Sequence, residues 1–383
     1  MPKNGETARV AVNGYGVIGK RVADAVAAQD DMELVGVSDV TFDYRLRVAA
    51  ERGYPIYASL VDQRAVMEDA GLPVAGTLET LLPRVDVVID CTPKGVGAKN
   101  KPLYDEAGVR AIFQGGEKHD LTGFSFVAQV NYAQALERRS ARVVSCNTTA
   151  ICRVLHALHQ RGWIKRARAV LLRRGTDPWE SHKHGMINTV LPETRVPSHQ
   201  GPDAETVLTG LDITTMAGAG PYNLSHIHFA MVETTRPIRL DELRHALWEE
   251  PRVAFVRAAD GLVSLNAVIE LMRDLRRPRA DMWEVAIWED ALATDGREVY
   301  LTLQVHNEAI TIPESVDAVR ALTGIERDVH ASMARTNQTL GVVKSFLPST
   351  LAEEETHAEM GQRLQGEQQR FRDEGFKGAE EPT

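Results

Sequence analysis

One of the three cysteines, Cys146, stands where a thiol can become a nucleophile. It lies in the run Ser145-Cys146-Asn147-Thr148-Thr149, between a strand expected over residues 142–145 and a helix expected over residues 149–160. The first N–H groups of a helix have no partner within the helix, so they stabilise a thiolate placed there. The same donors, with Asn147 and Thr148, can hold the oxyanion of a tetrahedral adduct. The pattern therefore predicts covalent catalysis through Cys146.

A glycine-rich turn near the N-terminus has the spacing G-x-G-x-x-G. It follows a strand expected over residues 9–13, opens a helix, and reads Gly14-Tyr15-Gly16-Val17-Ile18-Gly19. In this context the first glycine permits a tight turn, the second lets the backbone approach a pyrophosphate, and the third lets the helix lie close to the strand. The helix N-terminus then holds the anion. The turn predicts a dinucleotide site.

Asp39 bears on which dinucleotide is used. It ends the second expected strand, 20 residues after Gly19, where a carboxylate accepts the hydroxyls of the adenosine ribose. The same carboxylate would repel a ribose 2′-phosphate, which favours NAD over NADP as the cofactor. In the alternative interpretation Asp39 points to solvent, and a cation approaches the phosphate from Lys20, Arg21 or Arg45.

A thiol and a nicotinamide together suggest the oxidation of a thiohemiacetal to a thioester. An isolated cysteine is more often a small core residue, but the dinucleotide turn upstream favours a nucleophile at Cys146. Hydride can leave the thiohemiacetal only while its hydroxyl proton is removed, and histidine is suited to this near neutral pH. Strand alternation places His226 and His228 on one face of a strand expected over residues 226–234. No cysteine or carboxylate at supporting spacing accompanies this pair, so no metal is expected.

Arginines and a polar loop are candidates for binding phosphate. Arg173 and Arg174 end a strand expected over residues 167–173, and neighbouring strand residues face opposite ways, so only one of them is expected to enter the site. Gln200 and Gly201 lie in a later loop that can supply further donors. An ordinary turn is the alternative interpretation of that loop.

The composition is that of a soluble globular protein. The chain has 383 residues, a net charge of -9 and 43% hydrophobic residues, which suits two domains and argues against a nucleic-acid-binding protein. Three cysteines do not make a disulfide framework, and no apolar run approaches the length of a membrane span. A cytoplasmic protein is expected.

Strands that alternate with helices up to Cys146 predict an α/β Rossmann domain over residues 1–145. Longer strands then predict an α+β catalytic domain with a mostly antiparallel sheet over residues 146–312. Residues 313–348 return to a helical pattern and are expected to form a C-terminal helix that packs on the Rossmann domain. Residues 349–383 are rich in acidic side chains, and a solvated tail is expected there.

Several long motifs resemble those of archaeal-type glyceraldehyde-3-phosphate dehydrogenases. The resemblance extends over about residues 8–343, and its motifs are residues 12–21, 97–104, 111–117, 145–149, 197–203 and 305–308. It implies a homotetramer that oxidises D-glyceraldehyde 3-phosphate to 1,3-bisphosphoglycerate, with inorganic phosphate as acyl acceptor and NAD or NADP as hydride acceptor. It assigns the nucleophile to Cys146 and favours His228 over His226 as the base.

The resemblance also implies contacts around these two residues. Substrate contacts fall at Ser145 and Asn147, while cofactor contacts fall at Val17, Ile18, Gly116 and Asn307. Arg174, Gln200 and Gly201 occupy positions that handle cofactor or substrate phosphate.

The chain departs from the family pattern at Ala150, Cys152, Asp39 and residues 180–186. These departures bear on the phosphate contacts and the choice of cofactor. Aspartate-semialdehyde dehydrogenase and N-acetylglutamyl-phosphate reductase share the thioester logic and are the nearest enzymatic alternatives. A catalytically silent NAD-binding interaction protein is the alternative from another class.

Overall fold

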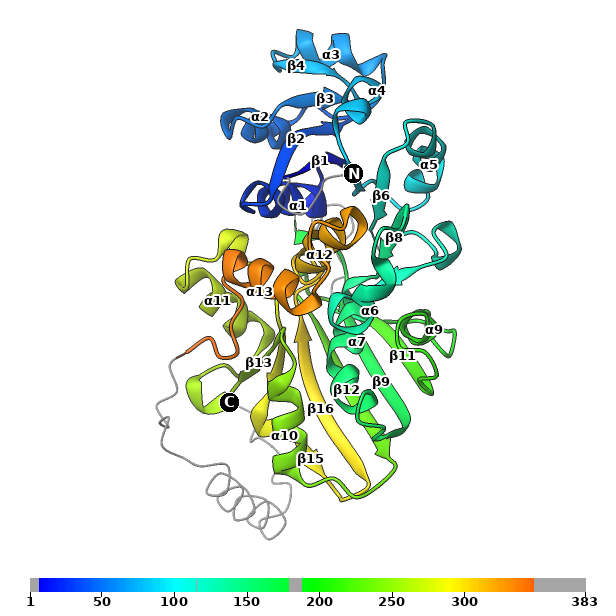
Figure 1. Cartoon of the computed structure of the whole chain (residues 1–383). Helices are drawn as coiled ribbons and strands as arrows, with labels where there is room; N and C mark the ends of the chain where they lie inside the picture. Colours follow the sequence, from blue (N-terminus) through cyan, green and yellow to red (C-terminus); the bar gives the residue numbers. More distant parts are fainter. Residues whose placement is uncertain (1–6, 115, 179–187, 348–383) are drawn as a thin grey trace.

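The structure, a computed structural model, describes residues 7–114, 116–178 and 188–347. The expected acidic tail lies outside these residues. Figure 1 shows two domains, each built on one large sheet, with a C-terminal helix between them. Among the described residues, the helices include none that is long and apolar enough to cross a membrane.

The first domain is built on an eight-stranded sheet whose strand pairs are all parallel. Its order is β4-β3-β2-β1-β5-β6-β8-β7. The strands are β1 (Ala8–Asn13), β2 (Met32–Asp39), β3 (Ile56–Ala58), β4 (Val74–Thr77), β5 (Val87–Asp90), β6 (Arg110–Phe113), β7 (Ser125–Phe126) and β8 (Ser140–Val143). The helices are α1 (Val17–Ala27), α2 (Tyr44–Glu51), α3 (Gln63–Asp69), α4 (Leu78–Leu81), α5 (Val96–Glu106) and α6 (Ala128–Ala135).

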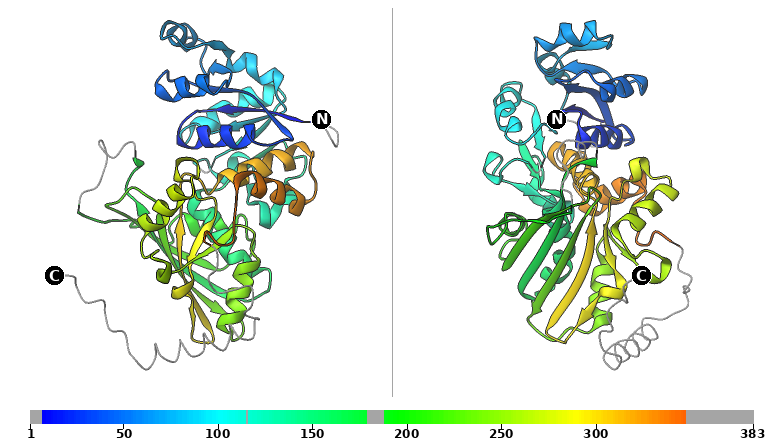
Figure 2. Two further views of the ribbon diagram at one scale, coloured as in Figure 1. Left: turned by 90° about the vertical axis from the view of Figure 1, so that its left-hand side faces the viewer. Right: turned by 180° about the vertical axis from the view of Figure 1, so that it is seen from behind.

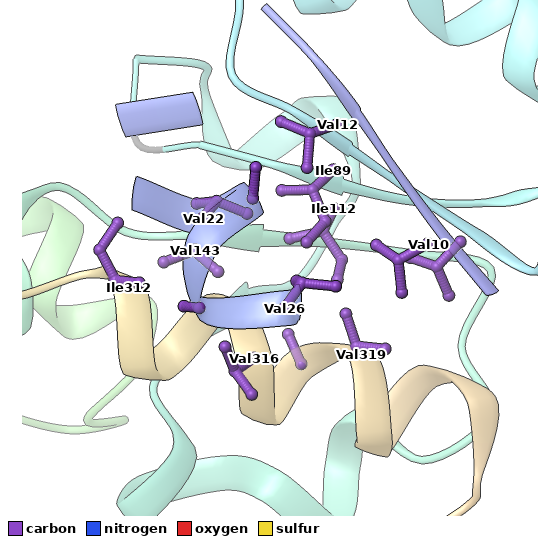
Figure 3. Packing of buried hydrophobic residues seen from close by; sticks show 14 of the residues in the cluster. Val10, Val12, Val22, Val26, Ile89, Ile112, Val143, Ile312, Val316 and Val319 are labelled. Atoms are coloured by element: carbon purple, nitrogen blue, oxygen red, sulfur yellow. The ribbon is translucent and has the colours of Figure 1, made fainter. Parts of the chain in front are cut away.

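Both faces of this sheet are covered, as its short apolar strands require. Alternate residues of β1 contribute to two different apolar clusters, with Val10 and Val12 on one face and Ala11 on the other. On the first face Val22 and Val26 of α1 meet Val316 and Val319 of α12 (Ile312–Thr323), as Figure 3 shows. Helix α12 is buried along its whole length.

The C-terminal segment forms two helices where one was expected. Helix α12 ends at Gly324, which has a positive φ of 73° and so allows the chain to reverse. Helix α13 (Val329–Leu340) follows and packs on α12 and α6.

The second sheet is mixed, with the order β10-β11-β9-β12-β16-β14-β13, and β15 pairs with β16 at one side. The β11–β9 and β13–β14 pairs are parallel and the others antiparallel, so the expectation of a mostly antiparallel sheet holds only in part. The strands are β9 (Ile164–Arg174), β10 (Leu191–Pro192), β11 (Ile213–Gly220), β12 (His226–Thr234), β13 (Val253–Val256), β14 (Val285–Trp288), β15 (Ala293–Thr294) and β16 (Glu298–Val305).

Helices cover one face of the second sheet, and they include α7 (Cys146–His159), α9 (Gln200–Glu205) and α10 (Leu240–Glu249). On the opposite face α11 (Leu265–Asp274) packs near β13 and β14. The rest of that face is turned toward the viewer in the right panel of Figure 2. There Val170, Met216 and Phe229, which are neighbours across three strands, are exposed.

Candidate active site

The glycine turn between β1 and α1 leaves no room for a side chain at its first and third glycines. Gly14 has a φ of 91°, and a Cβ on it would lie 2.8 Å from backbone atoms of Cys91 and Thr92. A Cβ on Gly19 would lie 1.8 Å from the carbonyl oxygen of Gly14. Gly16 is the N-cap of α1, and no described side chain caps the helix. The N–H groups at this end therefore suit a pyrophosphate, and the turn fits the predicted dinucleotide.

Asp39 lies at the end of β2 and is only 8% exposed. One carboxylate oxygen accepts from the backbone N–H of Tyr15 at 2.6 Å. The other accepts from the N–H groups of Val40 and Thr41 and from the Thr41 hydroxyl, at 2.7–3.0 Å. Asp39 therefore shapes the glycine turn and the chain that follows β2, rather than pointing to solvent.

Arg21 joins α1 to the loop that contains Asn307. Its guanidinium donates to the Val17 carbonyl oxygen at 2.9 Å, to Asp281 at 2.7 Å and to Glu308 at 2.6 Å. Asp281 and Glu308 therefore pair with Arg21, which was one of the candidate cations for the cofactor phosphate. Asn307 is nearly buried in this loop, between β16 and α12.

Gly116 lies against Lys94, since a Cβ on it would be 3.4 Å from the Lys94 Cα. The adjacent Glu117 accepts from the N–H groups of Gly95 and Gly97 at 2.7 and 3.1 Å. The Gly116 loop is thereby fixed at the first turn of α5.

Cys146 is the first residue of α7. Burial raises the pKa of its thiol to about 11, while the charge of Arg174 and the N–H groups of Asn147 and Cys146 act to lower it. Arg173 lowers it to a smaller extent. The helix terminus and the arginines therefore favour the thiolate, although burial outweighs them.

Hydroxyl groups beside Cys146 form a chain that ends on a carboxylate. Ser145 caps α7 by accepting from the Thr148 N–H, and the two hydroxyl oxygens are 2.9 Å apart. Thr148 donates its own proton to Asp203 at 3.0 Å, so the Ser145 hydroxyl donates to Thr148. Asp203 also accepts from Arg142 at 2.5 Å. Sequence reasoning missed Asp203 and Arg142, although Asp203 closes the motif at residues 197–203.

His228 is buried beneath the start of α7. Its Nε2 lies 2.8 Å from Oδ1 of Asn147, and because an amide oxygen only accepts, Nε2 carries the proton. Nδ1 is then the acceptor nitrogen, and it has no hydrogen-bond partner among the described residues. Burial lowers the pKa of His228 to about 3, so the ring is neutral at physiological pH.

His226 lies on the same face, at the first residue of β12. Its Nδ1 accepts from the N–H of Arg174 at 2.9 Å, so Nε2 carries the proton of the neutral ring. Burial, followed by the charge of Arg174, holds the pKa of His226 well below its usual range. Of the two rings, His226 presents a donor and His228 an acceptor.

The side chain of Gln200 is fully buried at the start of α9, and neither its nitrogen nor its oxygen has a partner among the described residues. The next residue, Gly201, donates its N–H to Thr215 at 3.0 Å. Arg173 pairs with Glu193 at 3.0 Å, and Arg174 pairs with Asp177. Among these residues the amide of Gln200 has no described partner for either of its polar atoms, and the Nε atoms of Arg173 and Arg174 also lack one.

Electrostatic contacts connect the two halves of the site. Arg174 lowers the pKa of Cys146, His226 and His306, and Arg21 also acts on His306. His306, the residue before Asn307, is therefore within electrostatic reach of both Arg21 of α1 and Arg174 of β9. Among the described residues, no group of histidine, cysteine and carboxylate side chains could hold a metal ion.

Comparisons with known proteins match both parts of the chain. Residues 145–289 match the family described as Glyceraldehyde 3-phosphate dehydrogenase, C-terminal domain, and residues 8–125 match Dihydrodipicolinate reductase, N-terminus. The chain is 46% identical over 338 residues to Glyceraldehyde-3-phosphate dehydrogenase 1 of Methanosarcina barkeri, covering 88% of this chain and 99% of the relative. It is 47% identical over 335 residues to Glyceraldehyde-3-phosphate dehydrogenase of Methanothermobacter thermautotrophicus, covering 87% and 99%.

Proposed function

The chain belongs to the family of archaeal-type glyceraldehyde-3-phosphate dehydrogenases, and from this premise we propose its reaction. It oxidises D-glyceraldehyde 3-phosphate reversibly to 1,3-bisphosphoglycerate, with inorganic phosphate as acyl acceptor and NAD or NADP as cofactor. The observation that carries the proposal is the thiol of Cys146 at the N-terminus of α7, beside Arg174.

The sulfur of Cys146 adds to the aldehyde carbon and the thiol proton passes to the carbonyl oxygen, which becomes the hydroxyl of a thiohemiacetal and gains negative charge as that proton is removed. The N–H groups at the start of α7 and the Nε2 proton of His226 are the donors we assign to this oxygen. A nicotinamide held near Gly116 and Asn307 would supply the acceptor for the hydride that leaves this carbon. The product is a thioester on Cys146, which inorganic phosphate cleaves to release the acyl phosphate and the thiol.

Removal of the hydroxyl proton of the thiohemiacetal is assigned to His228, as the family resemblance implies. The acceptor nitrogen of His228 without a described partner supports this role, and its bond to Asn147 places it next to the nucleophile's neighbour. His226 is the competing candidate. Its acceptor nitrogen is already bonded to Arg174, which supports a role as donor instead.

We assign the phosphate groups of substrate and acyl acceptor to Arg174, Gln200 and Gly201. Buried amide atoms without partners support Gln200, because a buried polar group needs a hydrogen bond. Ser145 and Thr148 donate their protons along the chain to Asp203, so we expect them to fix α7 and to offer substrate only acceptor oxygens.

The cofactor lies, in this proposal, across the first domain. The turn from Gly14 to Gly19, including the N–H groups of Val17 and Ile18, would hold its pyrophosphate, and Gly116 and Asn307 would hold its nicotinamide end. The tight backbone contacts of Gly14 and Gly19 support the first assignment. Residues 1–145 would then hold all of the cofactor except the nicotinamide end near Asn307, and residues 146–312 would carry the acyl chemistry. NAD is the cofactor we expect to be preferred.

We further propose a homotetramer in the cytoplasm. The exposed row of Met216, Val170 and Phe229 across the uncovered part of the second sheet supports association, because a second copy would remove this apolar surface from water. Free cysteines support a reducing compartment.

The test is a spectrophotometric assay of purified protein with D-glyceraldehyde 3-phosphate and each cofactor, with and without phosphate. The proposal predicts steady turnover with phosphate, and a burst limited to one reduced cofactor per thiol without it. An inert protein that still binds NAD would instead be a silent relative. Activity with another semialdehyde alone would reassign the substrate.

A further inference from the structure

The adenosine end of the cofactor site contains a second carboxylate that the sequence did not single out. Asp43 caps α2 by accepting from the N–H of Arg45 at 3.0 Å. It also pairs with the guanidinium of Arg45, whose Nε and Nη2 lie 2.9 and 2.6 Å from its two oxygens. The Asp43 side chain is 41% exposed, whereas Asp39 is nearly buried.

An open hollow of about 620 Å³ lies beside this pair. It is lined by Val40, Thr41, Phe42, Asp43, Tyr44 and Arg47, and the side chains of Val40, Phe42 and Tyr44 are exposed there. Asp39 is not among the lining residues. Arg45 reaches the glycine turn, since its Nη1 would lie 3.9 Å from a Cβ on Gly16. The hollow therefore adjoins the turn where the pyrophosphate is expected, and Asp43 is its acidic group.

We propose that the Asp43–Arg45 pair selects between NAD and NADP, whereas Asp39 builds the turn for both cofactors. This inference rests on the proposed function, because it assigns the adenosine ribose to this hollow. With Asp43 ionised, the charge of Arg45 is balanced and Asp43 presents acceptors for ribose hydroxyls, which favours NAD. A 2′-phosphate would have to compete with Asp43 for the guanidinium, which binds carboxylate and phosphate in the same bidentate way.

Asp39 differs because its oxygens already serve the backbone. Four donors from Tyr15, Val40 and Thr41 converge on it, and both cofactors need the turn that they fix. Replacing Asp39 should therefore weaken the two cofactors together and leave their ratio unchanged. Replacing Asp43 should change the ratio.

The experiment measures binding of NAD, NADP, AMP and adenosine 2′,5′-bisphosphate to the full chain by calorimetry, for wild type, Asp43→Asn, Asp39→Asn and Asp43→Asn/Arg45→Gln. Asparagine retains a good helix cap, so α2 is preserved. Asp43→Asn should tighten binding of the two 2′-phosphorylated ligands by about tenfold, and Arg45→Gln in the double variant should abolish this gain. Glu51→Gln, with the same charge change on the exposed end of α2, is the matched control and should shift the ratio by less than about twofold.

An unchanged ratio in Asp43→Asn would overturn the inference, as would an equal shift in Asp39→Asn. Circular dichroism and melting of each variant separate loss of selection from loss of folding. The burst assay reports on the proposed function independently. If the wild-type protein forms no acyl-enzyme, the proposed function is wrong, whatever its ratio of affinities for NADP and NAD. If the burst is normal but Asp43→Asn leaves that ratio unchanged, only the further inference is wrong.

Discussion

Two helix N-termini take part in the proposed reaction, and their first residues are arranged differently. The start of α1 is made of glycine and aliphatic residues, and no described side chain caps it. The start of α7 is capped by Ser145, and its hydroxyl chain runs through Thr148 to Asp203. In the proposed mechanism the N–H groups of the first terminus are left for the pyrophosphate of the cofactor, whereas the second terminus is fixed by its own side chains around the proposed nucleophile, Cys146. Substitutions at the start of α1 should therefore affect cofactor binding, and substitutions at the start of α7 should affect the rate of the reaction.

The largest expected effect is at the nucleophile. Cys146→Ser should lower oxidation by several orders of magnitude, because the covalent route is lost, while the dissociation constant for NAD stays near that of wild type. Steady-state assays and calorimetry measure the two quantities. Cys152→Ala is the control, since Cys152 is buried in the apolar cluster behind α7. Comparable turnover in Cys146→Ser and wild type would refute the mechanism.

Substitutions of His228 and His226 should affect different parts of the reaction, because we assign His228 as the base and His226 as a hydrogen-bond donor. His228→Asn should reduce the acylation rate by about 10²- to 10⁴-fold, the usual scale for a positioned general base. His226→Asn removes a donor to the alkoxide and should cost about 10²- to 10³-fold. Rapid-mixing measurements of the burst phase give both rates. If the His226 variant alone shows a large loss, the assignment of the base to His228 is wrong.

A substitution at the start of α1 should weaken NAD binding and leave the reactivity of Cys146 unchanged, whereas Cys146→Ser should do the reverse. In Gly19→Ala the new methyl group collides with the Gly14 carbonyl, and the strain of about 1–3 kcal/mol should weaken NAD binding about tenfold to a hundredfold. The rate at which iodoacetamide alkylates Cys146 should remain that of wild type. Unaltered NAD affinity would show that the turn does not hold the cofactor.

The smallest expected effect is at the end of the hydroxyl chain. Asp203→Asn weakens the acceptor for Thr148 and for Arg142, and should lower kcat about tenfold without altering NAD binding. Glu205→Gln changes the same charge at an exposed position of α9 and serves as the control. Equal effects from both variants would indicate a general electrostatic cause instead of the fixed geometry of α7.

Local patterns explain which parts of the fold could be predicted from sequence. The glycine turn, β12 and the helix after Cys146 each depend on short-range spacing, and the structure contains all three. The strands β11 and β13 were not predicted, and their parallel pairs with β9 and β14 make the second sheet mixed. These pairs are not visible in local patterns, because parallel pairing joins residues that are far apart in sequence.

The partners of the site residues were harder to predict. Asp203 and Asp281 contact Thr148 and Arg21 from other elements, at separations of 55 and 260 residues. Asp39 was expected at the end of β2 and lies there, but only the structure shows that its oxygens accept from the backbone. Residue type and position in the sequence were enough to name candidate site residues, but their hydrogen-bond partners could be identified only from the tertiary structure.

The most direct test of the account is to detect the acyl-enzyme. Purified protein is mixed with D-glyceraldehyde 3-phosphate and NAD in phosphate-free buffer, quenched with acid and analysed by peptide mass spectrometry. We predict one phosphoglyceroyl group on Cys146, which disappears when phosphate is added before the quench. Formation of reduced cofactor without any adduct on Cys146 would contradict the covalent mechanism.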